Sequence, residues 1–382
     1  MNLLVTGAAG FIGSTYVRTL LGPASEVASA GRRLARPLAA PGESPSTSST
    51  RASARHAEST HQTPPGPPSG RTTPLPTQAL AADGPDITVL DKLTYAGTLD
   101  NLELDHPRLE FVQGDICDAE LVDKLMSRAD QVVHFAAESH VDRSIIGATD
   151  FVRTNVLGTQ TLLDAALRHG VGTFVHVSTD EVYGSIDTGS WPEDHPLSPN
   201  SPYSASKASS DLLALAYHRT HGLDVRVTRC SNNYGPHQFP EKVIPLFVTN
   251  LLDGKKVPLY GEGLNVRDWL HVDDHCQGVE LVRTKGRPGE VYNIGGGTEL
   301  SNKELTGLLL EACGAGWDRV EHVEDRKGHD LRYSVDWSKA RTELGYRPRH
   351  DFATGLADTV AWYRENRAWW EPLKQRVARE SA

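Results

Sequence analysis

The sequence is poor in residues on which several classes of protein depend. Its 382 residues include only four cysteines, and these are Cys117, Cys230, Cys276 and Cys313. They lie far apart and form no CxxC pair, so neither a disulfide framework nor a thiolate metal site is expected. No apolar run reaches the length that a membrane span requires. We therefore expect a protein of the reducing cytoplasm.

Positive charge is also in deficit, because 39 Lys and Arg residues face 49 Asp and Glu residues, a formal net charge of -10. This balance argues against nucleic acid or an anionic membrane as a partner, but it allows phosphate to bind at a helix N-terminus. The apolar start at 3–5 follows no Lys or Arg and runs directly into glycines. It is therefore predicted to be a first strand and not a targeting segment. A small phosphorylated molecule fits this chain better than a polymer.

What the sequence does contain is a glycine-rich loop at 7–13, directly after the first predicted strand. Its spacing is GxxGxxG, a variant of the dinucleotide fingerprint in which glycines let the backbone approach a pyrophosphate at a helix N-terminus. Such turns occur in many α/β proteins, so the motif alone is weak. The acidic residue expected about 20 positions later, to hold a ribose, does not appear there.

Residues 31–82 interrupt the first crossover with a tract rich in Pro, Ser, Thr, Ala and Arg, which holds nine of the 23 prolines. It shows no sustained apolar period, so we predict a disordered insertion. The strand pattern resumes at 87–90 and ends in Asp91. A carboxylate there would accept a ribose 2'-hydroxyl and repel a 2'-phosphate, which favours NAD over NADP; the alternative is a residue that only begins a turn.

Strands and helices then alternate along the chain. The predicted strands are 87–90, 109–112, 131–135, 173–178 and 225–228. Helical patterns lie between them, for example at 119–128, and this order predicts a doubly wound parallel sheet of the Rossmann type. We expect residues 1–235 to form an NAD-binding domain, to which 272–297 return, and residues 236–382 to form mainly a smaller substrate-binding lobe.

Two further helices are predicted at 155–169 and 203–221. The second carries Leu212, Leu213, Leu215 and Ala216, which could pack internally or against a second subunit. A homodimer is therefore one interpretation, and a core role for these residues is the other.

Two clusters of polar residues predict the reactive centre. Thr179, Asp180 and Glu181 follow the strand at 173–178, and ligands of open α/β sheets bind just beyond the carboxyl ends of strands. Tyr203 and Lys207 are four residues apart and share one face of a predicted helix. An attraction of about 3 kcal/mol, at roughly 5 Å and a dielectric near 20, would lower the tyrosine pKa by about two units. Either cluster alone could be a turn or surface packing.

The segment at 266–275 suggests a metal cluster, but Asp273 and Asp274 are predicted to cap the helix that runs to Arg283, so no metal is expected. Arg267 is better suited to bind a diphosphate through charge-assisted hydrogen bonds. The chain has no GxSxG motif, so His140 is interpreted as one of the substrate and cofactor contacts and not as part of a hydrolase triad.

Together these residues resemble the dTDP-glucose 4,6-dehydratase family of the extended short-chain dehydrogenase/reductase superfamily. The resemblance covers almost the whole chain outside 31–82, and it rests on the glycine loop and on 93–97, 134–145, 177–184, 203–207, 232–236, 240–242, 267–275 and 328–330. The Asp180-Glu181 pair separates dehydratases from the epimerases of the superfamily. Ala8 replaces a commoner glycine, and the insertion separates Gly13 from Asp91.

The resemblance implies a role for each matching position. The implied catalytic residues are Thr179, Asp180, Glu181, Tyr203 and Lys207. The implied NAD contacts are Gly7, Gly10, Phe11, Ile12, Gly13, Asp91, Lys92, Asp115, Ile116, Tyr203 and Lys207. The implied substrate contacts are Ser139, Thr179, Asn232, Lys242, Arg267, Asn302 and, more loosely, His329.

The resemblance also implies a reaction, the dehydration of dTDP-glucose to dTDP-4-dehydro-6-deoxyglucose with transient reduction of NAD, in a homodimeric enzyme of antibiotic or rhamnose sugar biosynthesis. Tyr203 would take the C4 hydroxyl proton, Glu181 would abstract the C5 hydrogen and Asp180 would protonate the leaving C6 hydroxyl. Asp180 must then be protonated near neutral pH, a shift of about three units that burial and Glu181 could supply. The alternatives are a nucleotide-sugar 4-epimerase and a non-catalytic NAD-sensing protein.

Overall fold

The structure is a computed structural model, and it describes residues 1–22 and 84–380. The predicted disordered insertion at 31–82 lies outside the described residues. In the described part of the chain, every helix is too short or too polar to cross a membrane.

The elements follow one another in this order: β1 (Asn2–Thr6), α1 (Phe11–Leu21), β2 (Asp86–Asp91), η1 (Leu99–Asn101), β3 (Leu109–Gln113), α3 (Ala119–Met126), β4 (Gln131–His134), α4 (Val141–Ile146), α5 (Thr149–Phe151), η2 (Val152–Gly158), α6 (Thr159–His169), β5 (Thr173–Thr179), η3 (Asp180–Tyr183), α7 (Pro202–His221), β6 (Val225–Cys230), β7 (Asn232–Tyr234), α8 (Val243–Leu252), β8 (Val257–Tyr260), β9 (Val266–His271), α9 (Val272–Lys285), β10 (Val291–Ile294), β11 (Glu299–Ser301), α10 (Asn302–Cys313), η4 (Trp317–Arg319), β12 (Val320–Val323), η5 (Ala340–Leu344), α11 (Phe352–Glu365) and α12 (Arg367–Glu380).

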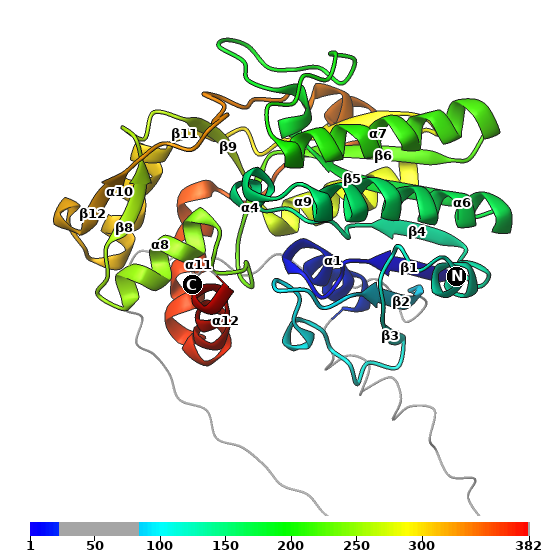
Figure 1. Cartoon of the computed structure of the whole chain (residues 1–382), viewed down its shortest axis with the longest axis horizontal. Coiled ribbons are helices and arrows are strands. Elements are labelled where there is room, and N and C mark those ends of the chain that lie inside the picture. The colour runs from blue at the N-terminus through cyan, green and yellow to red at the C-terminus, as the bar shows by residue number, and fades with distance from the viewer. Residues whose placement is uncertain (23–83, 381–382) are drawn as a thin grey trace, which may run out of the picture. The chain divides into compact units, whose positions relative to one another are not determined.

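A seven-stranded sheet with the order β10-β6-β5-β4-β1-β2-β3 organises the chain, and all of its neighbouring strands run parallel. Helices α6 and α7 cover one face, and α1 and α9 cover the other (Figure 1). Because both faces are covered, the strands need apolar side chains on both sides, and all seven residues of β5 are buried. The predicted doubly wound parallel sheet is confirmed.

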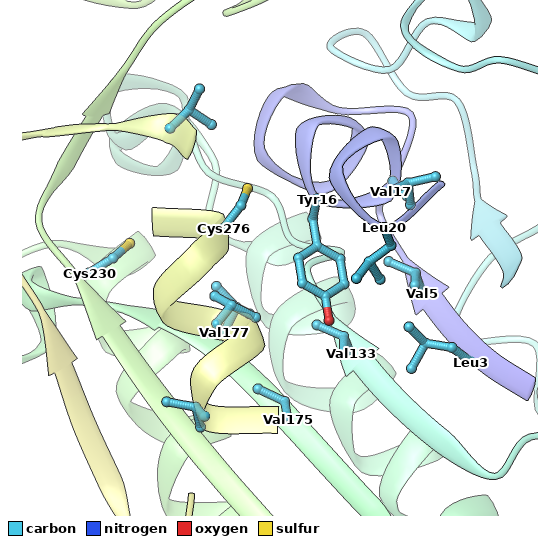
Figure 2. Close-up of a cluster of buried hydrophobic side chains, with 14 of the residues drawn as sticks. Leu3, Val5, Tyr16, Val17, Leu20, Val133, Val175, Val177, Cys230 and Cys276 are labelled. Atoms are coloured by element: carbon cyan, nitrogen blue, oxygen red, sulfur yellow. The ribbon is translucent and has the colours of Figure 1, made fainter. Parts of the chain in front are cut away.

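The core between the sheet and the pair α1 and α9 is drawn in Figure 2. Leu3 and Val5 of β1, Val133 of β4 and Val175 of β5 belong to this apolar cluster together with Tyr16 of α1. The Tyr16 ring is fully buried, and its hydroxyl donates to Glu280 Oε2 at 2.7 Å. Each such buried aliphatic side chain contributes about 1.5–3 kcal/mol, so this layer fixes the strand ends that carry the polar residues of the site.

Two small sheets, β11-β9-β7 and β12-β8, lie outside the main sheet. A separate apolar cluster supports them, built around Phe247, Leu309 and Trp370 from α8, α10 and α12. Strand β10 is an edge strand of the main sheet although it follows β8 and β9 in the chain. The expected division into residues 1–235 and 236–382 stays a prediction.

The helix predicted at 155–169 begins differently from an ideal α-helix. Residues Val152–Gly158 form a π-helix, and only Thr159–His169 are α-helical. The buried Asn155 side chain donates to Glu138 O at 3.0 Å and to Ser206 Oγ at 2.8 Å, and its oxygen accepts from Glu138 N at 2.9 Å. These contacts with other segments accompany the wider turn, and π-helical turns of this kind often occur at functional sites.

The predicted cap of α9 is wrong. The N-cap residue is His271, whose Nδ1 accepts from the backbone N–H of Asp273 at 3.2 Å. Asp274 instead accepts from the backbone N–H groups of Arg349 and His350, each at 3.0 Å. The sequence could not show this because the partners of Asp274 lie about seventy residues further along the chain.

Candidate active site

A cavity of about 350 Å³ opens at the carboxyl ends of β1, β2, β4, β5 and β6, the position at which open α/β sheets bind ligands. Most of the expected site residues line it. They are Gly7, Gly10, Phe11, Ile12, Gly13, Asp91, Lys92, Asp115, Ile116, Ser139, Thr179, Asp180, Glu181, Tyr203, Lys207, Asn232 and Lys242. Three expected substrate contacts, Arg267, Asn302 and His329, do not line this cavity.

The glycine loop between β1 and α1 needs its glycines for physical reasons. Gly7 has a φ of +74°, and a Cβ there would collide with the backbone of Ala136. A Cβ at Gly13 would lie 2.7 Å from Gly7 O. The loop can therefore pack closely only without side chains, and it leads into the N-terminus of α1, where backbone N–H groups and the helix dipole favour phosphate. These residues fit the pyrophosphate of a dinucleotide.

Asp91 ends β2 beside this loop. Its two carboxylate oxygens accept from Ala9 N at 2.9 Å and from Leu93 N at 2.8 Å, while burial raises its pKa. Next to it, Lys92 forms an ion pair of 2.8 Å with Asp115. The carboxylate is thus held at the strand end, where it can accept a ribose hydroxyl. Its role as a ribose contact stays a prediction.

Thr179, Asp180 and Glu181 form the turn from β5 into η3. Thr179 Oγ1 donates to Asp180 Oδ1 at 3.2 Å and accepts from the backbone N–H of Glu181 at 3.3 Å. Asp180 Oδ2 is buried and has no hydrogen-bond partner among the described residues. Burial, and then the charge of Glu181, raises the pKa of Asp180 well above its ordinary value. The predicted direction of this shift is confirmed.

Glu181 is held closer to ionisation than its neighbour. Burial raises the pKa of Glu181 above its ordinary value, and the positive charges of Arg326, Arg267 and Lys242 limit this rise. The pair therefore combines one acid that keeps its proton with one that releases it more readily. This separation of two adjacent carboxyl groups by their surroundings is what acid/base catalysis requires.

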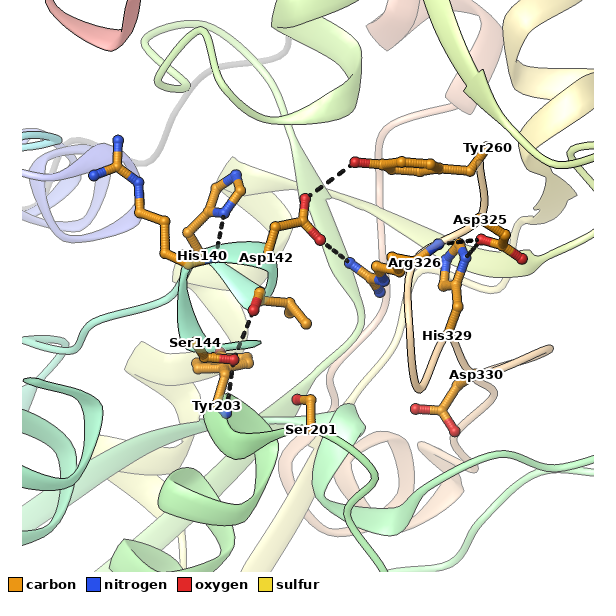
Figure 3. A network of polar contacts seen from close by, with 12 residues as sticks. His140, Asp142, Ser144, Ser201, Tyr203, Tyr260, Asp325, Arg326, His329 and Asp330 are labelled. Atoms are coloured by element: carbon orange, nitrogen blue, oxygen red, sulfur yellow. Dashed lines mark hydrogen bonds and ion pairs between the residues drawn. The ribbon is translucent and has the colours of Figure 1, made fainter. Parts of the chain in front are cut away.

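Arg326 is a residue of the site that the sequence reasoning missed. It lies on the polar loop at 325–333, from which only His329 was singled out. Figure 3 shows Arg326 directed at Asp142, with Nη1 3.6 Å from Oδ1, while Tyr260 donates to the other oxygen of Asp142 at 3.3 Å. His329 itself is paired with Asp325 at 2.6 Å. The hydrogen-bond donors in this loop were the signal in the sequence that could have identified Arg326.

Tyr203 and Lys207 lie on the first turns of α7 and both line the cavity. Lys207 Nζ donates to Val177 O at 2.8 Å, and burial lowers the pKa of Lys207 to about 8. Burial, and then Glu181, raises the pKa of Tyr203 well above its ordinary value. The predicted lowering of the tyrosine pKa is therefore wrong for the protein alone, because desolvation and the nearby carboxylate of Glu181 determine the direction of the shift.

Arg267, which is buried, and Asn302, which is half-buried, make contacts outside the lining of the cavity. The Arg267 guanidinium donates to Val266 O at 2.7 Å and to Asp330 O at 3.0 Å, and it lies 4.2 Å from the centre of the Tyr333 ring. Asn302 begins α10 and donates its backbone N–H to Asn265 O at 2.9 Å. The expected contacts of both residues with substrate stay predictions.

Within residues 1–22 and 84–380, His271, Asp273 and His350 form a group with metal-ligand chemistry, in which the potential ligand atoms lie within 4.8 Å of one another. The two imidazole rings are stacked, with centroids 3.9 Å apart and planes tilted by 18°. Ring nitrogens in nearly parallel planes do not direct their lone pairs at one point, so this arrangement does not match the tetrahedral geometry that zinc prefers.

Comparison with known proteins adds independent findings. The family described as GDP-mannose 4,6 dehydratase matches residues 77–359. A dTDP-glucose 4,6-dehydratase of Streptomyces antibioticus is 66% identical over 382 residues, which are 100% of this chain and 98% of that protein. One from Streptomyces griseus is 60% identical over 374 residues, 97% of each chain.

Two solved structures allow the dehydratases to be compared with a rival activity. DesIV of Streptomyces venezuelae, a dTDP-glucose 4,6-dehydratase crystallised with NAD and dTDP, is 56% identical, covers 98% of this chain and 100% of its own, and gives a TM-score of 0.80. The UDP-glucose 4-epimerase of Thermotoga maritima is 28% identical, covers 96% and 99%, and gives a TM-score of 0.75. The TM-scores show that both backbones resemble that of this chain to a similar degree. The higher sequence identity of DesIV favours the dehydratases.

Proposed function

The chain belongs to the GDP-mannose 4,6-dehydratase family within the extended short-chain dehydrogenase/reductases, and on this premise we propose that it dehydrates dTDP-glucose to dTDP-4-dehydro-6-deoxyglucose. One observation carries the proposal. Asp180, which is buried, and Glu181, which is half-buried, are adjacent carboxyl groups whose surroundings separate their tendencies to ionise. Removal of water from a sugar needs one group that takes a proton and one that gives a proton. The product would serve deoxysugar biosynthesis, of antibiotics or of rhamnose.

The cofactor of the proposed reaction is NAD, which when bound accepts a hydride from C4 of the sugar and returns it to C6. Gly7, Gly10 and Gly13 would hold its pyrophosphate at the N-terminus of α1, and Asp91 would hold a ribose. Tyr203 and Lys207 line the same cavity from α7. The chain thus offers contacts for both ends of a dinucleotide.

The chain's own residues divide the proton transfers. Tyr203 takes the proton of the C4 hydroxyl, and Thr179 holds that hydroxyl in place. The raised pKa of Tyr203 makes the positive charge of Lys207 necessary for this step. Glu181 then removes the C5 hydrogen, which a C4 ketone makes acidic, and Asp180 gives its proton to the departing C6 hydroxyl. Glu181 returns a proton to C5 when the hydride is delivered to C6.

Basic residues around Glu181 supply the charge for a substrate diphosphate. Lys242 lines the cavity, and its Nζ donates to Ser139 O at 2.8 Å. Arg267 and Arg326 act on the charge of Glu181 from the neighbouring loop and strand. These cations support a nucleotide-sugar substrate, because a diphosphate carries negative charge that buried cations must balance.

A homodimer is also proposed, on the strength of apolar side chains that the fold leaves exposed. Ile146 is 89% exposed on α4, Val152 and Leu157 are 54% and 51% exposed on η2, and Leu212 is 55% exposed on α7. A shallow apolar groove lies between η2 and α7 beside them. A second copy would bury this surface, which is unusual on a monomer.

A cytoplasmic location is proposed because all four cysteines are free thiols.

The test of the proposed function follows one hydrogen atom. The protein is incubated with NAD and with dTDP-glucose that carries deuterium at C4. The proposal expects a 4-keto-6-deoxy product with deuterium at C6. A product epimerised at C4, with no loss of water, would assign the rival epimerase activity. No turnover at all, with NAD bound, would assign the non-catalytic NAD-sensing alternative.

A further inference from the structure

A second group of charged residues lies buried beneath the proposed active site. Asp211 follows Lys207 by four residues on α7, just as Lys207 follows Tyr203, so the three side chains lie along one face of the helix. Asp211 is fully buried. Its Oδ2 accepts from Arg229 Nε of β6 at 2.8 Å, and its Oδ1 lies 3.3 Å from His176 Nε2 of β5.

The groups that face Lys207 come from four elements. Tyr203 and Asp211 lie on α7, His134 on β4, His176 on β5 and Cys230 on β6. Burial lowers the pKa of each histidine and raises the pKa of each of the Tyr203 and Cys230 side chains, so these four groups are neutral near pH 7. Asp211 differs.

Although burial opposes its ionisation, Arg229 and His176 together hold the pKa of Asp211 at about 2. It therefore supplies the negative charge that faces Lys207 in this cluster. Burial by itself would remove the proton from Lys207, and the charge of Asp211 acts in the opposite direction.

We propose that Asp211 is a positioning residue that acts through Lys207: its carboxylate, anchored by Arg229 and His176, keeps the ammonium four residues before it on α7 charged below the site. The proposal rests on the proposed function, in which a charged Lys207 assists Tyr203. Without the carboxylate, burial would discharge Lys207, and the unpaired guanidinium of Arg229 would add repulsion.

The test is the pH profile of kcat for Asp211→Asn, measured from about pH 6 to about pH 10 with saturating dTDP-glucose and NAD. We expect the alkaline limb to move to lower pH by about one unit, which is about a fivefold loss near pH 8 and little loss near pH 6. A loss of equal size at every pH, with the limb unmoved, would overturn the proposal and assign Asp211 to structure alone. Absence of dehydration by the unaltered protein would refute the proposed function instead.

Asp224→Asn is the matched control. Asp224 pairs with Arg226 at 2.7 Å, so it is also an aspartate bound to an arginine of β6, but at the opposite end of that strand. Its substitution should leave the pH profile unmoved. If Asp211→Asn does not fold, the double variant Asp211→Asn/Arg229→Gln replaces the ion pair by two amides. A smaller shift of the limb in the same direction is expected, because Lys207 has lost its counter-charge without gaining the repulsion of an unpaired guanidinium.

The pH dependence of stability gives a second test that does not require turnover. The pKa of Lys207 is about 8 in the folded protein and 10.5 in an ordinary lysine, so between these values the unfolded chain binds more protons and stability rises with pH. In Asp211→Asn this rise should begin at lower pH, measured as Tm against pH. A rise that begins at the same pH in the variant and in the unaltered protein would contradict the role of Asp211.

Discussion

Two buried aspartates in this fold, Asp180 and Asp211, have opposite charge states. Asp180 lies at the cavity, keeps one oxygen without a hydrogen-bond partner among the described residues, and has a raised pKa. Asp211 lies beneath the cavity, receives the guanidinium of Arg229 at 2.8 Å, and has a pKa of about 2. Both are removed from water. The difference shows that burial keeps a carboxyl group protonated unless a cation lies against it.

Among the substitutions that test the contrast between the two aspartates, Asp180→Asn should have the largest effect. Asparagine keeps the shape of a protonated aspartate but cannot donate the acidic proton, so we expect kcat for dehydration to fall by about 10²- to 10⁴-fold. Oxidation at C4 should be largely retained, because it depends on Tyr203. Single-turnover measurements that follow NADH and product separately would check both statements. An undiminished overall rate in this variant would contradict the assignment of the acid.

Stability should show the reverse order. Arg229→Gln leaves the charge of Asp211 buried without its cation, and we expect a loss of about 3–5 kcal/mol in the free energy of unfolding. Asp180→Asn removes the cost of holding a proton that the unfolded chain releases near neutral pH, so it should not lower the free energy of unfolding there. Urea denaturation of both variants measures the difference. Equal losses would mean that the two aspartates do not differ in charge.

The contrast between Asp180 and Glu181 can be reduced by removing Arg326. Among the positive charges that lower the pKa of Glu181, Arg326 has the largest effect. In Arg326→Gln the base should keep its proton to higher pH, so the acid limb of the kcat profile should move up and activity near neutral pH should fall by about tenfold. Arg319→Gln, at an exposed position on η4, serves as the control and should leave the limb unmoved. If the acid limb does not move in Arg326→Gln, Arg326 does not control the pKa of Glu181.

The last expected effect is the pH dependence of stability. Because the pKa of Asp211 is lowered from 3.8 to about 2, it stabilises the fold above about pH 4, and this contribution of about 2 kcal/mol is lost as pH falls towards 2. Asp180 has a raised pKa, so its contribution is present at low pH and is lost as pH rises. Asp211→Asn should therefore flatten the acid side of the stability curve, and Asp180→Asn should not. Denaturation midpoints at several pH values measure this, and equal flattening would contradict it.

Much of the fold was accessible from the sequence because its signals are local. Runs of β-branched residues predicted the strands, and glycine spacing predicted the loop at 7–13, where a Cβ at Gly7 or Gly13 would collide with backbone. The raised pKa of Asp180 was also predictable, since it needs only burial and the adjacent Glu181.

What the sequence could not show depends on contacts between distant segments. The π-helix at Val152–Gly158 accompanies hydrogen bonds of Asn155 with Glu138 and Ser206. The direction of the Tyr203 pKa shift depends on the burial of its side chain and on the charge of Glu181 beside it. The place of Arg326 depends on how the loop at 325–333 folds back on α4. Spacing along the chain carries none of this information.

The most direct measurement is the infrared difference spectrum between the unaltered protein and Asp180→Asn at neutral pH. A buried carboxyl group that keeps its proton gives the carbonyl stretch of a neutral acid, and an ionised group gives the paired bands of a carboxylate. We expect the neutral-acid band in the unaltered protein and its loss in the variant. Carboxylate bands that disappear instead would show that Asp180 is ionised and would contradict its role as the acid.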